Sequence, residues 1–267
     1  MTTSTTSSTT TSSAGIDETD RVARRGPVTF SATYLLMDLR RSLRNRRTLL
    51  FLLVMPVVFF FAFAGPYRSQ NDIYTYIMVS MAVYGAMIAT TSTGASVAVE
   101  RSLGWTRQLR LTPLRPAGYV LTKVLSALVL GIVPVALVLG AGVVSGARLG
   151  ATAWVECAVA SWVCSLVFAA FGLFMGYLVP AENVMQFIGP LLGLLSFFGG
   201  LFVPLDQLPG PLRDIAPWTP TYAVGQIARS PITDSGLTAG NIGLLLFWTA
   251  AFALGTGLLF RRDTARV

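Results

Sequence analysis

The sequence predicts an all-α membrane protein with six transmembrane helices, and three observations lead to that prediction. Of the 267 residues, 53% are hydrophobic and only 12% are charged, and the mean hydropathy is +0.64. A soluble domain carries about 25% charged residues, and a chain of this length has too little interior to hide so much apolar surface. The apolar residues are also gathered into six long runs. Lipid must therefore replace water over most of the surface.

The amino-terminal region divides into two segments of different character. Residues 1–29 are rich in Ser and Thr and hold almost no large apolar side chains. They cannot bury enough surface to offset the entropy lost on ordering, so we expect a disordered tail. In residues 30–47 apolar side chains recur at helical spacing (Ala32, Leu35, Leu36, Leu39 and Leu43), with Arg40, Arg41, Arg44, Arg46 and Arg47 around them. This pattern predicts an amphipathic helix in the headgroup layer; the alternative is an extension of the first span into the cytoplasm.

Six apolar segments form a predicted transmembrane domain over residues 48–260, and residues 261–267 form a short tail. The segments are Leu49 to Ala64, Tyr74 to Val99, Val124 to Ala147, Trp154 to Val179, Val184 to Val203 and Ala239 to Phe260. Most reach the roughly 20 residues needed to cross the hydrocarbon. Pro56, Pro134 and Pro190 interrupt three of them, where kinks are expected. The pairs Gly172 with Gly176 and Gly189 with Gly193 predict close helix contacts.

The distribution of Lys and Arg predicts which side each end occupies. Eight arginines precede the first span, five basic residues lie between the second and third, and three follow the sixth, which places sixteen on one face. The other face has only Arg68, Arg148, Arg213 and Arg229. Cytoplasmic loops carry the excess of basic residues. We therefore expect both termini in the cytoplasm and the chain in the cell membrane.

The same composition excludes several chemistries. The chain has no histidine, which removes Ser-His-Asp and Cys-His catalysis and most zinc sites. Cys157 and Cys164 lie two helical turns apart and cannot form a mutual disulfide. The net charge of +8 is scattered in short clusters between apolar runs, which does not indicate nucleic-acid binding. Glu156, Glu182 and Lys123 are expected near span ends, within reach of water, so no residue for ion coupling is found at mid-span.

The connection from Val99 to Lys123 is the most informative loop. It is rich in both charged and apolar residues, and Trp105, Leu109 and Thr112 share one helical face. Thr112 and Pro113 end that predicted helix. A cytoplasmic helix that carries Trp and Leu, in a protein with short loops elsewhere, indicates a docking element for a soluble partner. The alternative is a solvated helix that contacts nothing.

Residues in this loop carry a resemblance to a known family. Glu100-Arg101, Gly104-Trp105, Leu109 and Thr112-Pro113 resemble the Glu-Arg…Gly…Leu…Thr-Pro signature of ATP-binding-cassette type 2 exporter permeases. That family includes drug, polysaccharide and lipid-linked-glycan exporters. The resemblance extends over nearly the whole chain, with an amphipathic helix before span one, the signature after span two, and a proline-rich stretch between spans five and six.

The proline-rich stretch contains Pro204, Pro209, Pro217, Pro220 and Tyr222. It is similar to the family's re-entrant helices, which dip into the outer leaflet near the exit of the pathway. From the residues alone, proline-broken apolar backbone near the bilayer must be covered by protein or face a cavity. The alternative is an inert outer loop.

The resemblance implies that one subunit forms the membrane pathway and a different subunit hydrolyses ATP. The chain has no Gly-x-x-x-x-Gly-Lys-Ser/Thr loop to cradle ATP phosphates, so we expect no cofactor in it, with ATP and Mg in a separate ATPase subunit. The resemblance implies two identical permease chains and two ATPase chains, with the pathway between the permeases. Trp105 and Leu109 would be apolar anchors in the ATPase cleft, and Glu100, Arg101 and Arg110 would make the polar contacts around them.

Aromatic side chains are candidates for the pathway lining. They are Phe59, Phe60 and Phe63 in span one, and Phe197, Phe198 and Phe202 in span five. Lipid-facing aromatics would follow the same pattern. The lack of mid-span charge favours an amphipathic or hydrophobic cargo, such as a drug or a lipid-like molecule.

Two other function classes remain open from the sequence. An ion-coupled secondary carrier or channel would transport without an ATPase complex, and a membrane scaffold or signalling protein would have a docking helix but no cargo. A membrane enzyme is the weakest alternative, because no paired carboxylates or metal-ligand cluster occurs at one depth.

Overall fold

The computed structural model describes residues 32–44, 46–104, 116–207, 209–233 and 237–265, and within these ranges the chain is helical with no strand. The predicted tail of residues 1–29 lies outside them. Ten α-helices are described: α2 (Ala32–Arg44), α3 (Arg46–Ala64), α4 (Asn71–Ser102), α6 (Pro116–Ser145), α7 (Ala151–Cys164), α8 (Leu166–Leu178), α9 (Ala181–Phe198), α10 (Gly210–Ile215), α11 (Pro220–Thr233) and α12 (Ala239–Ala265). Short 3₁₀ turns, η2 (Gly65–Tyr67), η3 (Leu205–Gln207) and η4 (Ala216–Trp218), join some of them.

Five helical segments in the described part of the chain are long and apolar enough to cross a membrane. They are Asn71–Ser102, Gly118–Ser145, Ala151–Leu178, Ala181–Phe198 and Ala239–Arg262, and Leu52–Tyr67 is a shorter apolar helix. Five spans are therefore supported by length and composition, and the sixth, at α3, stays a prediction. The fourth span is built from α7 and α8, which follow each other across a break at Ser165.

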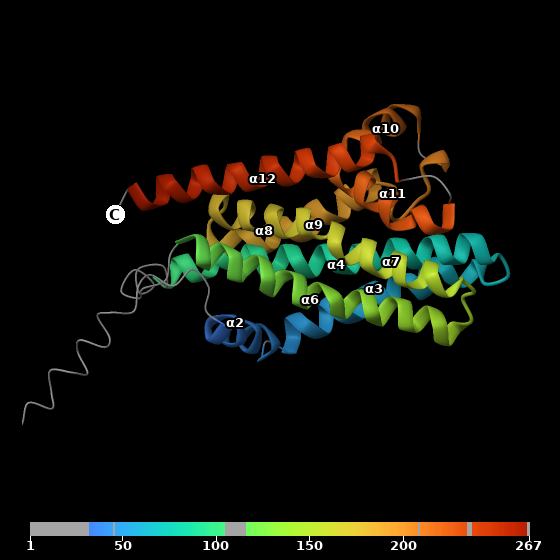
Figure 1. Ribbon diagram of the computed structural model, residues 1–267, viewed down its shortest axis with the longest axis horizontal. Coiled ribbons are helices and arrows are strands. Elements are labelled where there is room, and N and C mark those ends of the chain that lie inside the picture. Colours follow the sequence, from blue (N-terminus) through green and yellow to red (C-terminus); the bar gives the residue numbers. More distant parts are fainter. Residues whose placement is uncertain (1–31, 45, 105–115, 208, 234–236, 266–267) are drawn as a thin grey trace, which may run out of the picture.

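Helix α4 is the centre of the bundle (Figure 1). It packs most extensively on α6 and α8 and also contacts α3, α9 and α11. Two prolines meet it at Gly85, where an added Cβ would lie 2.8 Å from Pro134 Cβ and 3.1 Å from Pro56 Cγ. The two prolines predicted to kink spans one and three thus pack against the same glycine of α4.

Small residues let α8 approach α4 closely, as expected for helices that pack in lipid. A Cβ on Gly172 would lie 2.2 Å from the carbonyl oxygen of Thr91, and one on Gly176 would lie 3.2 Å from that of Ala95. Nothing lies within 4 Å of a Cβ on Gly189 or Gly193. The predicted close contact is thus found at the first glycine pair and not at the second.

The two ends of the bundle differ in character (Figure 1). Helix α2, the last turn of α4, the first turns of α6 and the end of α12 lie at one end, named here the basic end because Arg41, Arg101 and Arg261 lie there. The turn η2, the α6–α7 connection and α10 lie at the opposite end. Helix α2 exposes Leu36, Met37 and Leu43, and its one buried residue is Asp38. An apolar outer surface of this kind suits the predicted interfacial position, which stays a prediction.

Candidate functional site: buried charges at both ends of the central helix

Three charged side chains from three helices meet inside the basic end. The Lys123 ammonium of α6 donates to Asp38 Oδ1 of α2 and to Glu100 Oε1 of α4, each at 2.5 Å. The Lys123 side chain is only 1% exposed, and both carboxylates are buried as well. The expectation that water lies within reach of Lys123 is therefore wrong. One cation shared by two carboxylates ties α2, α4 and α6 together, because removing it would leave two buried anions facing each other.

Glu100 has partners on both carboxylate oxygens. Tyr119 of α6 donates its hydroxyl to Oε2 at 2.6 Å, and the half-exposed Arg41 of α2 lies 3.3 Å from Oε1. Asp38 differs, since its Oδ2 has no hydrogen-bond partner among the described residues. Glu100 is thus fixed within its own chain, while Asp38 keeps one acceptor unused.

Arg101, the next residue of α4, contacts a different helix. Its Nη1 donates to the carbonyl oxygens of Gly176 and Tyr177 at 3.1 and 3.2 Å, and its guanidinium lies 5.0 Å from the Tyr177 ring centre. These carbonyls belong to the last turn of α8, where a cation complements the helix dipole. The Glu100-Arg101 pair therefore fastens the end of α4 to α2 and α6 on one side and to α8 on the other.

Of the predicted docking residues, Glu100 and Arg101 lie within this junction and Gly104 lies just beyond it. Helix α4 ends at Ser102, and Gly104 follows with a φ of 71°, a left-handed conformation that glycine adopts without strain. Leu103 is 67% exposed. The other predicted docking residues, Trp105, Leu109, Arg110, Thr112 and Pro113, lie outside the described residues. The structure thus defines the base of the predicted docking element, and contact with an ATPase stays a prediction.

A cavity of about 550 Å³, lined by both polar and apolar side chains, opens beside the charge cluster. Its lining includes Asp38 and Arg41 from α2, Glu100 from α4, and the hydroxyl-bearing Ser92, Thr93 and Ser96 from α4. The hydroxyls of Thr93 and Ser96 donate to carbonyl oxygens of α4 itself, which leaves their oxygens free to accept. The cavity therefore offers hydrogen-bond acceptors within an otherwise apolar bundle.

The six aromatic residues predicted for the pathway divide into separate groups. Phe59 and Phe63 of α3 contact Phe202, with ring centres 6.0 and 5.8 Å from it, and Tyr84 of α4 joins them at 4.8 Å from Phe202. Phe60 points elsewhere, fully buried against Tyr74. The rings of Phe197 and Phe198 contact each other at 6.2 Å, and Phe197 is partly exposed.

The proline-rich stretch forms short helices at the opposite end. Pro204 precedes η3, Pro209 precedes α10, Pro217 lies in η4, and Pro220 starts α11, where Tyr222 donates its backbone N–H to the Thr219 hydroxyl. Thr221 Oγ1 donates to the carbonyl oxygen of Leu195 at 2.6 Å, which joins the start of α11 to the last turn of α9. The prolines therefore stand at helix boundaries, and a re-entrant position in the outer leaflet stays a prediction.

A second site of buried charge is formed by Arg229 of α11, which the distribution of Lys and Arg placed among the basic residues of the outer face. Its side chain is 0% exposed. Nη1 donates to Ser80 Oγ of α4 at 2.9 Å and lies 3.5 Å from the Gly200 carbonyl oxygen. The guanidinium also stacks on Tyr76 of α4, 4.4 Å from the ring centre. One signal in the sequence could have marked it, because Arg229 is the only charged residue of α11.

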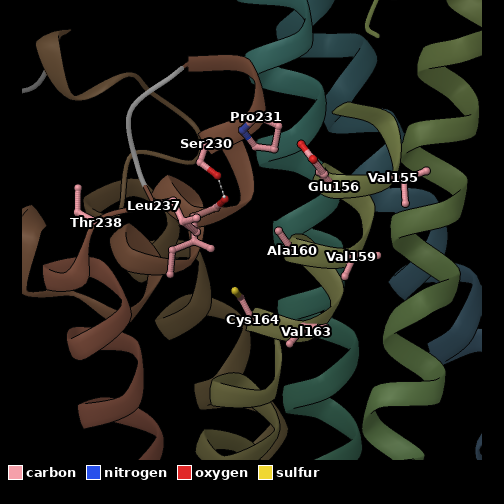
Figure 2. A pocket seen from close by; sticks show the side chains of 11 residues that line it. Val155, Glu156, Val159, Ala160, Val163, Cys164, Ser230, Pro231, Leu237 and Thr238 are labelled. Atoms are coloured by element: carbon pink, nitrogen blue, oxygen red, sulfur yellow. Dashed lines mark hydrogen bonds between the residues drawn. The ribbon is translucent and has the colours of Figure 1, made fainter. Parts of the chain in front are cut away.

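An apolar groove of about 850 Å³ runs between α7 and the α11–α12 segment (Figure 2). Val155, Val159 and Val163 line one side, and Ile227 and Leu237 contribute to the other. The exposed Glu156 points toward Ser230 and Pro231 (Figure 2). In the described part of the chain no three His, Cys, Asp or Glu side chains lie close enough to hold a metal ion.

Comparison with known proteins agrees with this architecture. Residues 66–261 match the family described as "ABC-2 family transporter protein". The chain is also 25% identical over 234 residues to the Bacillus subtilis (strain 168) protein named "Putative transport permease YvfS", and this similarity covers 85% of the chain and 96% of the relative. The match includes every described helix from α4 to α11 and nearly all of α12. The chain belongs to the ABC-2 family of transporter proteins.

Proposed function

We propose that this chain is the membrane subunit of an ATP-driven exporter, moved by a separate ATPase that docks on residues 105–113. Membership of the ABC-2 transporter family supports a membrane transport component. The observation that carries the coupling proposal is the junction just before the docking segment. Lys123 lies 2.5 Å from both Asp38 and Glu100, so a force applied beyond Gly104 acts on three helices at once.

The contacts at the end of α4 explain how movement of the ATPase reaches the membrane helices. Trp105 and Leu109 anchor in the ATPase cleft, and Arg110 adds polar contacts there. Glu100 and Arg101 hold the base of this element, through Lys123 and through the last carbonyls of α8. When the ATPase pair closes on ATP, the push reaches α4, α6 and α8 together, and α4 carries it along the length of the bundle.

The complete exporter contains two copies of this chain and two ATPase subunits, which hold ATP and Mg. Both termini lie in the cytoplasm, and the complex lies in the cell membrane. The pathway runs between the two permease copies, and the cluster of Phe59, Phe63, Tyr84 and Phe202 offers an aromatic wall for it. The cargo is an amphipathic or hydrophobic molecule: a drug, a lipid-like molecule or a glycan-linked lipid.

The test is co-purification with a Walker-motif ATPase, sought first in the neighbouring reading frame. Trp105→Ala combined with Leu109→Ala removes both proposed anchors, so the ATPase is expected to be lost from the purified complex while membrane insertion stays normal. Val144→Ala is the matched control, because Val144 is a 90% exposed apolar residue at the opposite end. Retention of the ATPase by the double variant at the level of the control would contradict the docking assignment.

A further inference from the structure

The most unusual side chain outside the docking region is Arg229, because its charge lies deep in the apolar part of the bundle. Its partner Ser80 is nine residues from the start of α4 at Asn71, which is roughly 14 Å along a helix. Ionisable residues at such depth are rare in membrane proteins, and they usually pair with one another or serve function. Within the described part of the chain Arg229 forms no ion pair.

The contacts of Arg229 use only one of its three nitrogens. Nη1 donates to Ser80 and lies near the Gly200 carbonyl, whereas Nε and Nη2 have no hydrogen-bond partner among the described residues. Tyr76 covers the face of the guanidinium and leaves its edge without an acceptor. Nε and Nη2 are the adjacent pair of donors that bind a carboxylate or a phosphate in a bidentate manner. The unused edge is therefore the one that recognises anions.

We propose that the Nε–Nη2 edge of Arg229 binds the anionic headgroup of an amphiphile, a phosphate or a carboxylate. This site implies that the exported cargo carries a negatively charged headgroup. Its role in export therefore rests on the proposed function. A buried cation without a counter-ion carries a large desolvation cost, and an anionic ligand offsets that cost where a neutral or cationic one does not.

Access to this edge requires Leu201 or the Arg229 side chain itself to move, because Gly225 lies on the same helix as Arg229, one turn earlier. A Cβ on Gly225 would lie 2.9 Å from Nη2 and 3.0 Å from Leu201 Cδ2, so the Gly225 backbone and Leu201 close over the guanidinium. Tyr76 also donates its hydroxyl to the Gly200 carbonyl at 3.2 Å. Tyr76, Ser80 and Gly200 thus hold the guanidinium in this covered position, and an anion that occupies the edge competes with that arrangement.

Photo-crosslinking of the full-length chain in phosphatidylcholine nanodiscs tests the site. The probes are hexadecyl phosphate, hexadecanol and hexadecyl trimethylammonium, each with the same diazirine in its chain, and labelled peptides are mapped. The phosphate is expected to label α11 or the facing turns of α4 around Tyr76 and Ser80, roughly tenfold more than the other two, because charge-assisted bidentate hydrogen bonds are among the strong ones. Equal labelling by the three probes would overturn the proposal.

Matched variants distinguish labelling at the Arg229 site from labelling caused by the general attraction of anions to a basic protein. Arg229→Gln is expected to lose the phosphate-specific labelling, and Arg229→Lys, which keeps the charge without the bidentate edge, to retain part of it. Arg148→Gln is the control, because Arg148 is an exposed cation at the same end of the bundle as Arg229, beside the start of α4. Should Arg229→Gln fail to fold, Gly225→Ala is the second variant, since its methyl group would displace the guanidinium. Undiminished labelling in a folded Arg229→Gln or Gly225→Ala protein would refute the site.

Competition identifies where the anion comes from. If unlabelled phosphatidylglycerol in the nanodisc displaces the probe, membrane lipid supplies the headgroup; if it does not, the site selects a separate cargo, and either result upholds an anion site. The assay needs no ATPase. Its failure therefore leaves the docking proposal intact, and loss of docking would leave this labelling unchanged.

Discussion

At the scale of single residues, the buried charged side chains are the ones on which the proposals depend. Lys123 and Arg229 are both buried, yet they differ in how they are compensated. Lys123 has two carboxylates at 2.5 Å, whereas Arg229 has a hydroxyl, a carbonyl and an aromatic ring. The first arrangement is suited to holding helices together, and the second to receiving a ligand.

Replacing Lys123 with Met is expected to destabilise the protein strongly. The change leaves Asp38 and Glu100 buried without their shared cation, which costs about 3–5 kcal/mol and lowers the midpoint of thermal unfolding by roughly 10 °C. The measurement is size-exclusion chromatography of the detergent-solubilised protein after heating. Adding Glu100→Gln should recover part of the loss, because one of the two anions that lose Lys123 is then neutral.

Arg68→Met is the control for this series, because Arg68 is exposed near η2. A Lys123→Met protein as heat-stable as the control would mean that the cluster contributes nothing to holding α2, α4 and α6 together.

At the scale of elements, helices were predictable and their partners were not. Apolar runs predicted the span Tyr74 to Val99, and α4 extends it to Asn71–Ser102, because a helix continues into polar turns after hydropathy has fallen. The pairing of Lys123 with Asp38 joins residues 85 positions apart, and no local pattern reveals such a contact. The burial of Arg229 was not predicted, because the residues of α11 lie in the connection between spans five and six. A basic residue in such a connection is usually exposed to water.

The two glycine pairs give an element-scale prediction. Gly172→Ala is expected to destabilise the α4–α8 contact by about 1–3 kcal/mol, because the new Cβ would lie 2.2 Å from the Thr91 carbonyl oxygen. Gly189→Ala should be neutral or stabilising, since nothing lies within 4 Å there and alanine favours the helix. Thermal midpoints of the two variants in the same detergent make the comparison. Equal effects would contradict the close packing of α8 on α4.

At the scale of the whole molecule, topology is the feature to test. The count of basic residues predicts that the basic end faces the cytoplasm, and those of them that lie on described helix ends, such as Arg41, Arg101 and Arg261, are found at one end of the bundle. Helical content and most span limits followed from hydropathy. The span count did not follow fully, because α3 is a shorter apolar helix by its described residues and hydropathy alone does not decide whether such a helix crosses the bilayer.

Cysteine accessibility in intact cells measures this topology. Cys157 and Cys164 are buried and are replaced with Ser to give a background without thiols. Leu103→Cys is expected to react with a membrane-impermeant maleimide only after permeabilisation, and Val144→Cys before it, since both positions are exposed at opposite ends. Reaction of Leu103→Cys in intact cells would reverse the orientation and remove the basis for ATPase docking.

The continuity of α4 has a thermodynamic consequence. Ser80, which holds Arg229, and Glu100, which holds Lys123, belong to one unbroken helix and lie twenty residues apart, about 30 Å. If occupancy of one end shifts this helix, linkage requires the effect to be reciprocal. An anion that strengthens ATPase binding by some factor must itself be bound more strongly by that factor when the ATPase is present.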